Sequence, residues 1–364
     1  MGLAALHQRS LLGETNNHHL ELEFHTKALN QLQEFVMSIN INEFRLENET
    51  LVEVVTCGIA LISFEVLRGS ATNWEPHFCA MTSIAITMHD QLQIVQSPNH
   101  FRSPLFESRA TAAMAFHIPV LLWMDLLACV ATREKPKFPY NEWLGSDCTF
   151  QLADIMGCHN SVMKAIGDLA TLTQWIVGSR ITDESYHEEF QQRRQQVENE
   201  LEAIIDITPV ASTNIRESMS ELSTSKTSQG QRPDQDCVTR IFATAALAQL
   251  AVVSARVPGN FSSTRTRWAV SRIIMEIKLA HQIVSPRKLS WAICVAGCLA
   301  DQDQQQFFEA LLNPIVSEGI GMIGNSGTVR DILRACWRNK IETPDQQWDC
   351  SSTMKHMGIC ALLI

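Results

Sequence analysis

Residues 288–300, KLSWAICVAGCLA, form the most apolar short segment of this sequence. Apolar residues recur along it at helical spacing, and the remaining side carries only the small side chains of Ser290, Cys294 and Gly297. A helix that is apolar on all sides belongs in a protein core. The segment is shorter than the ~18 residues that a membrane-spanning helix needs. We therefore predict a buried helix around which the rest of the chain packs, with Gly297 allowing another helix to come close.

The composition is that of a globular protein with a large core. Apolar residues make up 45% of the 364 residues and charged residues 19%, enough for one large domain or two ordinary ones. The formal net charge is −10, whereas nucleic-acid binding needs clustered Lys and Arg. Residues 1–9, MGLAALHQR, lack the basic start and long apolar stretch of a signal peptide. We expect an intracellular protein with no direct nucleic-acid partner and no membrane segment.

The eleven cysteines are scattered, and no Cys-x-x-Cys pair occurs among them. Zinc ribbons and zinc fingers are therefore not indicated. Cys294 and Cys298 lie one helical turn apart and could share a face, as half of a metal site or as two small core residues. Because free cysteine is common in buried helices, the sequence favours core packing and predicts no metal.

Nearly every segment has helical periodicity, which predicts about twelve helices in one all-α array. Gly69 is a predicted helix stop, and residues 132–147 are a predicted loop. Residues 212–236 are rich in Ser, Thr, Gln and Gly, so we expect a mobile insertion within a single domain spanning 1–364. A linker between two helical halves is the alternative. The predicted helices include 51–67, 74–95, 103–130, 154–177, 183–205, 238–253, 268–284, 288–300, 307–320 and 328–337.

Most catalytic signatures are missing from the sequence. It contains no phosphate-binding loop, no G-x-S-x-G elbow and no H-E-x-x-H motif. Residues 319–324, GIGMIG, match G-x-G-x-x-G, but they follow a predicted helix instead of a strand, so we interpret them as a turn. A terpene-cyclase type of enzyme would need clustered carboxylates for magnesium, and no D-D-x-x-D run occurs.

Several polar and aromatic residues on apolar helices remain as ligand-pocket candidates. Buried carboxylates need a partner, so Glu65 and Asp125 either pair with Arg68 or Arg109 or face a ligand. The histidines and tryptophans are either core residues or the lining of an apolar pocket for a lipid-like ligand. The full set of candidates is Glu65, Trp74, His77, His117, Trp123, Asp125 and Trp291.

A series of short motifs is spread over most of the chain. They are LAALH at 3–7, HTKAL at 25–29, FEVLRG at 64–69, WEPHF at 74–78, LSW at 289–291, AGC at 296–298, residues 325–337 and Trp348. In this order they resemble the regulatory domain of fungal zinc-cluster transcription factors. None of the six closely spaced cysteines of that family's DNA-binding module is present. The resemblance implies an all-α regulatory region, found in the nucleus, that acts through protein partners or an apolar effector.

Three hypotheses about function follow. The first is a transcription regulator of a metabolic pathway without its own DNA-binding module, either a fragment or a shortened form. The second is an enzyme of the cyclase, lyase or isomerase class, which would use magnesium and a prenyl substrate, with Glu65, Asp125 or His117 as polar groups. The third is an interaction module without a ligand. The first is favoured, and only the second requires a cofactor.

Overall fold

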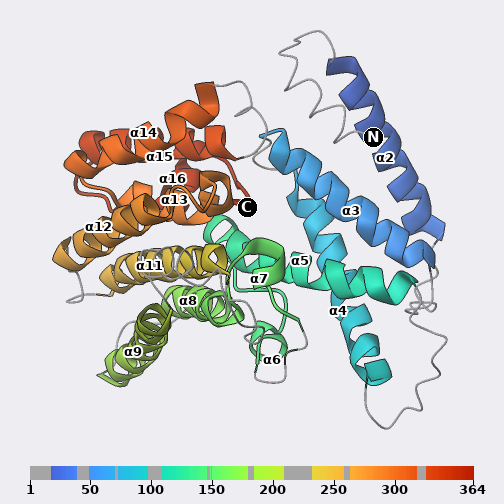
Figure 1. Cartoon of the computed structure of the whole chain (residues 1–364), viewed down its shortest axis with the longest axis horizontal. Helices are drawn as coiled ribbons and strands as arrows, with labels where there is room; N and C mark the ends of the chain where they lie inside the picture. The colour runs from blue at the N-terminus through green and yellow to red at the C-terminus, as the bar shows by residue number, and fades with distance from the viewer. Residues whose placement is uncertain are drawn as a thin grey trace, which may run out of the picture. The chain divides into compact units, whose positions relative to one another are not determined.

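The computed structural model describes residues 18–38, 49–69, 73–96, 109–145, 148, 150–178, 184–208, 232–257, 263–317 and 325–364. These residues form fourteen α-helices and one short 3-10 helix, η2, and no strand occurs among them (Figure 1). All α-helices except α6 and α7 are eight residues or longer. The predicted all-α fold of about twelve helices is confirmed. The GIGMIG turn and most of the predicted insertion, residues 212–231, lie outside the described residues.

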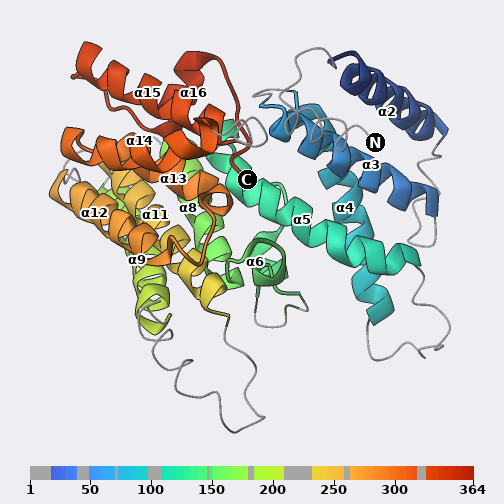
Figure 2. The ribbon, with the colours of Figure 1, turned by 45° about the horizontal axis from the view of Figure 1, so that its top comes forward.

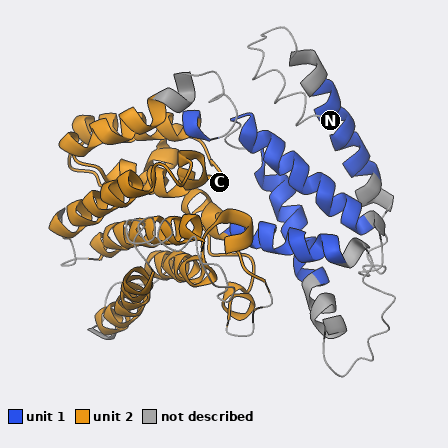
Figure 3. Ribbon diagram, in the orientation of Figure 1, with its two compact units in different colours: residues 1–125, 315–327 blue, residues 126–314, 328–364 orange. Residues whose placement is uncertain are grey.

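The chain divides into two compact units (Figure 3). Unit 1 comprises residues 1–125 and 315–327, and unit 2 comprises residues 126–314 and 328–364. The boundary at 125 falls within helix α5 (Arg109–Thr132), which continues through Pro119.

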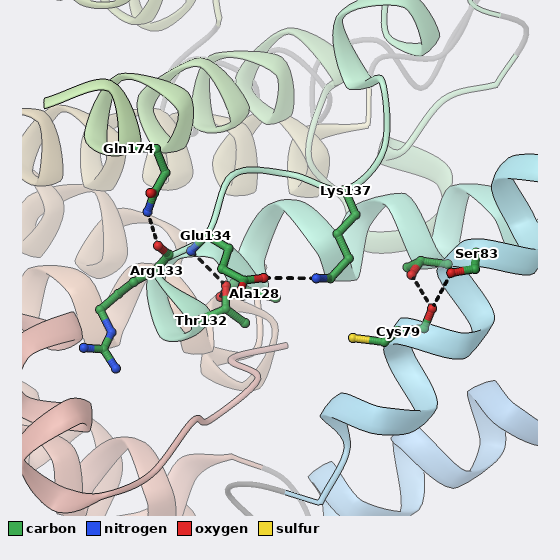
Figure 4. Close-up of polar contacts among 9 residues, drawn as sticks. Cys79, Ser83, Ala128, Thr132, Arg133, Glu134, Lys137 and Gln174 are labelled. Carbon is green, nitrogen blue, oxygen red and sulfur yellow. Dashed lines mark hydrogen bonds and ion pairs between the residues drawn. The ribbon is translucent and has the colours of Figure 1, made fainter. Parts of the chain in front are cut away.

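Unit 1 is built on α2 (His18–Ser38), α3 (Glu49–Leu67), α4 (Glu75–Gln96) and the first part of α5. Helix α3 packs against both α2 and α4. Gly58 of α3 lies directly against the Met81 side chain of α4, so the two helices approach closely. Gly69 has a φ of +80° and its N–H donates to the Val66 carbonyl at 3.0 Å, which confirms the predicted helix stop. On α4, the Ser83 hydroxyl donates to the Cys79 carbonyl at 3.0 Å (Figure 4).

Unit 2 contains the remaining helices (Figure 2). The predicted loop 132–147 includes the short helix α6, which packs against α8 through the contact of Tyr140 with Gly167. The helices are α6 (Tyr140–Trp143), α7 (Ala153–Met156), α8 (Asn160–Gly178), α9 (Glu184–Ile207), α11 (Pro233–Ala255), α12 (Ser263–Ala280), η2 (Pro286–Leu289), α13 (Ser290–Leu299), α14 (Gln302–Ser317), α15 (Ser326–Glu342) and α16 (Cys350–Met357).

Helix α11 is the centre of unit 2. It packs against α8, α9, α12 and α13, and every residue from Asp236 to Leu250 is buried. The predicted helix at 288–300 is divided into η2 and α13, and all ten residues of α13 are buried as expected. The prediction that the chain packs around residues 288–300 needs correction. The longer helix α11 contacts more helices of unit 2 than α13 does, so α11 is the helix around which unit 2 packs. Residues 233–236, predicted as insertion, form the first turn of α11.

Gly297 permits close packing on α13, as predicted. A Cβ atom at this position would lie 2.8 Å from Cδ2 of Leu333 on α15 and 3.2 Å from Cδ1 of Phe308 on α14. The Gly297 carbonyl also accepts a 2.8 Å hydrogen bond from Nε1 of Trp337. The absence of a side chain therefore brings three helices together at one point.

A buried ion pair ties α11 to its neighbours. Arg240 on α11 contacts Glu276 on α12 through two hydrogen bonds, 2.5 Å from Nη2 and 3.1 Å from Nε. Its Nη1 donates to the carbonyls of Ile205 and Thr208 at 2.6 and 2.8 Å. These carbonyls end α9, where helical backbone leaves acceptors unsatisfied. One guanidinium thus joins three helices.

Two described helical stretches are long and apolar enough to cross a membrane by length and composition alone. They are Ala112–Thr132 and Pro233–Ala255. Of their apolar windows, 67% and 94% respectively are buried inside the structure, which is the pattern of core helices.

Candidate functional site

A small pocket opens inside unit 2. Its walls come from the end of α5, the loop after it, α8, α11, α13 and α16, and its cavity volume is about 40 Å³. That volume holds a few water molecules or a small organic group. The lining is mainly apolar, with a few polar groups: Leu126, Cys129, Val130, Arg133, Glu134, Ile166, Leu169, Ala170, Thr173, Gln174, Gln249, Arg256, Trp291 and Ser351.

Two buried polar atoms of the pocket residues lack hydrogen-bond partners among the described residues. They are Nε1 of Trp291 and Oε1 of Gln249. Trp291 is only 2% exposed and Gln249 only 7%. The Trp291 ring stacks on Phe242 with ring centroids 5.5 Å apart. A buried polar group without a partner costs about 1–3 kcal/mol, so such groups call for an explanation. An indole donor and an amide acceptor that remain unpaired here are suited to a bound molecule.

The rim of the pocket contains an unusual backbone conformation. Arg133 follows α5 with a φ of 59°, and it is the one non-glycine residue with positive φ among those described. Its N–H donates to the Cys129 carbonyl at 2.9 Å, and its own carbonyl accepts from Nε2 of Gln174 (Figure 4). Glycine usually occupies this left-handed position after a helix, because it has no Cβ. Arginine therefore keeps a strained conformation at the pocket mouth.

Further contacts hold the rim in place. The Glu134 N–H donates to the Thr132 hydroxyl at 3.3 Å, and the Glu134 carboxylate pairs with Lys137 at 3.0 Å (Figure 4). On the α16 side, Nη2 of Arg256 lies 2.9 Å from Oδ2 of Asp349. Glu134 is the only carboxylate among the pocket-lining residues, and it is largely exposed. The pocket therefore lacks converging carboxylates for magnesium.

Glu65, predicted as a pocket candidate, lies in unit 1 and is 1% exposed. The sequence suggested Arg68 or Arg109 as its partner, but the structure places Nε2 of His25 2.9 Å from Oε1 of Glu65. The two side chains are in contact, but neither Nε2 of His25 nor Oε2 of Glu65 makes a hydrogen bond among the described residues. His77 belongs to the same group: burial lowers its pKa, an effect opposed by Glu65 and strengthened by His25.

His117 is held in one tautomer by its neighbour in unit 1. Its Nε2 lies 2.8 Å from the Thr56 hydroxyl oxygen, and that hydroxyl donates its own proton to the Val52 carbonyl at 2.7 Å. The Thr56 oxygen therefore accepts, and we assign the imidazole proton to Nε2. Nδ1 is buried without a partner, and burial lowers the pKa of His117.

The remaining candidates divide between the two units. Trp74 is fully buried, with its ring 5.6 Å from Phe78, and Asp125 is 2% exposed. Trp123, on α5, has a buried Nε1 without a hydrogen-bond partner. Among the seven predicted candidates, Trp291 lines the unit 2 pocket, whereas the other six belong to unit 1.

Most of the pocket residues could not be identified from sequence patterns. Gln249 lies in a run of apolar residues on α11, and Arg256 and Ser351 come from distant parts of the chain. Arg133 directly follows a helix, where a left-handed residue is common, but its type did not suggest one. These residues meet only through tertiary packing.

Comparisons with known proteins find one matching family and several relatives. Residues 1–364 match the family described as fungal specific transcription factor domain. Transcription factor dibT of Pestalotiopsis microspora is 22% identical over 93% of this chain and 58% of its own length. The trichothecene biosynthesis transcription regulator TRI10 of Trichoderma arundinaceum is 23% identical over 93% of this chain and 78% of its own length. No solved structure gives a significant match.

The family match covers the whole chain, and the relatives are transcription factors or transcription regulators. These findings confirm the resemblance identified from the sequence motifs, and they favour regulation over the enzyme hypothesis. The chain spans about three fifths of the Pestalotiopsis protein and about four fifths of the Trichoderma regulator. This protein belongs to the fungal specific transcription factor domain family.

Proposed function

We propose that this chain is the regulatory region of a transcription regulator that controls a biosynthetic pathway from the nucleus, through protein partners. The family supports regulation, and the trichothecene biosynthesis role of the TRI10 regulator from Trichoderma arundinaceum supports a pathway-specific target. The net charge of −10 argues against direct nucleic-acid contact by this part of the protein.

We further propose that the unit 2 pocket binds a small effector. The observation that carries this proposal is the pair of unpartnered buried atoms, Nε1 of Trp291 and Oε1 of Gln249. One needs an acceptor and the other a donor, and a single hydroxyl group supplies both. The apolar walls favour a compact ring or short chain around that hydroxyl. The effector class is therefore a small alcohol or phenol.

A thermal-shift titration tests the pocket. Phenol and cyclohexanol should raise the melting temperature of the full chain more than toluene and methylcyclohexane, which have no hydroxyl. Trp291→Phe keeps the ring and removes the indole N–H, so it should weaken phenol binding about 2–10-fold, the value of one hydrogen bond. The matched control is Trp268→Phe, at a half-exposed tryptophan outside the pocket, which should leave binding unchanged.

Equal shifts for the hydroxyl compounds and the hydrocarbons would remove the assigned role of Trp291 and Gln249. No shift with any of the four compounds would overturn the effector proposal.

A reporter assay tests the regulatory role. The chain would be fused to an unrelated DNA-binding domain in a fungal host, together with a reporter gene and a fluorescent tag. We expect nuclear fluorescence and a change in reporter expression relative to the DNA-binding domain alone. Unchanged expression would contradict a regulatory role for this chain.

A further inference from the structure

Four buried cysteines gather in unit 2, away from the residues assigned above. The Sγ atoms of Cys294, Cys298 and Cys350 all lie within 4.8 Å of one another, and all three residues are 0% exposed. Cys294 and Cys350 are the closest, with their Sγ atoms 3.2 Å apart. Cys336 on α15 is also 0% exposed, and its thiol donates to the Cys298 carbonyl at 3.4 Å.

The positions of these thiols are fixed by helices. Cys294 and Cys298 are one turn apart on α13, so their side chains share one face. Cys350 is the first residue of α16, and its place is set by a capping box in which the Asp349 carboxylate accepts from the Ser352 N–H at 2.6 Å. The hydrogen bond with Cys294 raises the pKa of the Cys350 thiol well above its usual range, so a metal ion that binds here displaces thiol protons.

The dimensions of the cluster suit a metal ion. A Zn–S bond is about 2.3 Å, so sulfurs that share one ion lie no more than about 4.6 Å apart. The cluster is already close to that size, and a small contraction would complete it. Its donors are all sulfur, with no imidazole or carboxylate in the group, and thiolates select soft cations such as Cu⁺ and Zn²⁺ over Mg²⁺ or Ca²⁺.

We propose that Cys294, Cys298 and Cys350 bind one thiophilic cation, Cu⁺ or Zn²⁺, in the core of unit 2. Three thiolates suffice for Cu⁺, whereas Zn²⁺ in a structural site takes four ligands. Cys336, whose thiol contacts the Cys298 carbonyl, becomes the fourth ligand in the Zn²⁺ form. The sequence favoured plain packing for Cys294 and Cys298, because free cysteine is common in buried helices. It did not indicate the third thiol, since Cys350 follows Cys294 by 56 positions and no local motif joins them.

The test is metal uptake by the full chain, purified under reducing conditions without chelators. Elemental analysis should find one equivalent of zinc or copper. After removal of the metal, Co²⁺ should bind with sulfur-to-cobalt charge-transfer absorption, and Cu⁺ should bind under anaerobic conditions in competition with bicinchoninate. Cys350→Ala should abolish uptake of both ions. Cys158→Ala, the matched control at another fully buried thiol of unit 2, should take up metal as the wild type does.

The Cys336→Ala variant distinguishes the two ions. It should lose Co²⁺ and Zn²⁺ binding if the site is a four-thiolate zinc site, and it should keep Cu⁺ binding if three thiolates form a copper site. Circular dichroism checks that each variant remains helical, and Cys350→Ser replaces Cys350→Ala if the latter unfolds. Three results would overturn the proposal: a folded wild type that takes up neither ion, uptake by folded Cys350→Ala or Cys350→Ser equal to wild type, or a Cys294–Cys350 disulfide in the freshly purified protein.

Discussion

The two units hold their buried charges with different chemistry. In unit 2, the Arg240 guanidinium donates to Glu276 and to two backbone carbonyls. In unit 1, the buried carboxylate of Glu65 faces the imidazole of His25. Arginine side chains stay protonated throughout the physiological range, whereas imidazoles gain and lose a proton near neutral pH. Burial lowers the pKa of His77 and of His117 in unit 1, so we expect these histidines to contribute to the pH dependence of stability.

The largest effect on stability is expected when the Arg240 guanidinium is removed from unit 2. Arg240→Met leaves Glu276 buried and unpaired, and it leaves the carbonyls at the end of α9 without their donor. We expect the free energy of unfolding, measured by urea denaturation, to fall by about 3–5 kcal/mol. The double variant Arg240→Met with Glu276→Leu should recover much of this loss, because no charge then remains buried alone.

Arg193→Met is the matched control for that variant. Arg193 pairs with Glu189 at 2.7 Å on the exposed side of α9, and both side chains are almost half exposed. Such a helix pair contributes about 0.3–0.5 kcal/mol. The Arg193 guanidinium also lies 5.1 Å from the centroid of the Trp175 ring, a contact that adds about 0.5–1 kcal/mol at an exposed site. If both variants lost a similar free energy of unfolding, the burial of the Arg240–Glu276 pair would not increase its contribution to stability.

The close packing at Gly297 gives the next largest effect. Gly297→Ala places a methyl group against Leu333 and Phe308, and we expect a loss of about 1–3 kcal/mol from overpacking. Gly178→Ala is the control, because nothing lies within 4 Å of a Cβ there and a helical alanine is favoured over glycine. Urea denaturation should therefore shift in opposite directions for the two substitutions. A stabilised Gly297→Ala would show that α13 has room for a side chain.

The strained rim of the pocket predicts a smaller gain in stability. Arg133→Gly should raise the free energy of unfolding by about 1 kcal/mol, because glycine adopts a φ of 59° without the Cβ penalty. Arg133→Ala removes the same side chain but keeps the Cβ atom, so it should bring no such gain. Urea midpoints of the three proteins compare the two effects. Equal midpoints for the glycine and alanine variants would mean that the backbone carries no strain.

The smallest effect is the pH response of unit 1 through His117. Burial lowers its pKa below the ordinary value of 6.5, so the unfolded chain binds this proton more readily than the folded chain. The stabilisation is complete above pH ~6.5 and declines as the pH falls below it. His117→Gln should reduce this decline, as measured by melting temperatures between about pH 7.5 and pH 5.5. An unchanged pH dependence in the variant would assign the response to other groups.

Sequence periodicity predicted the features that depend on residues close to one another in the sequence. The burial of α13, the role of Gly297 and the stop at Gly69 all follow from local patterns of apolar and small residues. The central position of α11 was missed, because an apolar stripe shows that a helix is buried but not how many other helices it contacts.

Partners that lie far apart in the sequence could not be predicted in this way. The sequence left Glu65 either to pair with an arginine or to face a ligand, and tertiary packing places His25 beside it. Cys350 joins Cys294 only when α16 docks on α13, and Gln249 meets Trp291 only in the folded pocket. Such contacts depend on the three-dimensional arrangement of helices, which periodicity does not encode.

The first turn of α16 contributes to two proposed sites at once. Cys350 belongs to the thiol cluster and Ser351 lines the pocket, while on α13 Cys294 and Trp291 are divided in the same way. If binding at one site shifts α13 or α16, the residues that form the other site therefore move as well. Thermodynamic linkage requires any such coupling to be reciprocal: if the cation changes the affinity for the effector by some factor, the effector changes the affinity for the cation by the same factor. Because α13 and α16 contribute to both sites, the response of this regulator to its effector would depend on the supply of the metal ion.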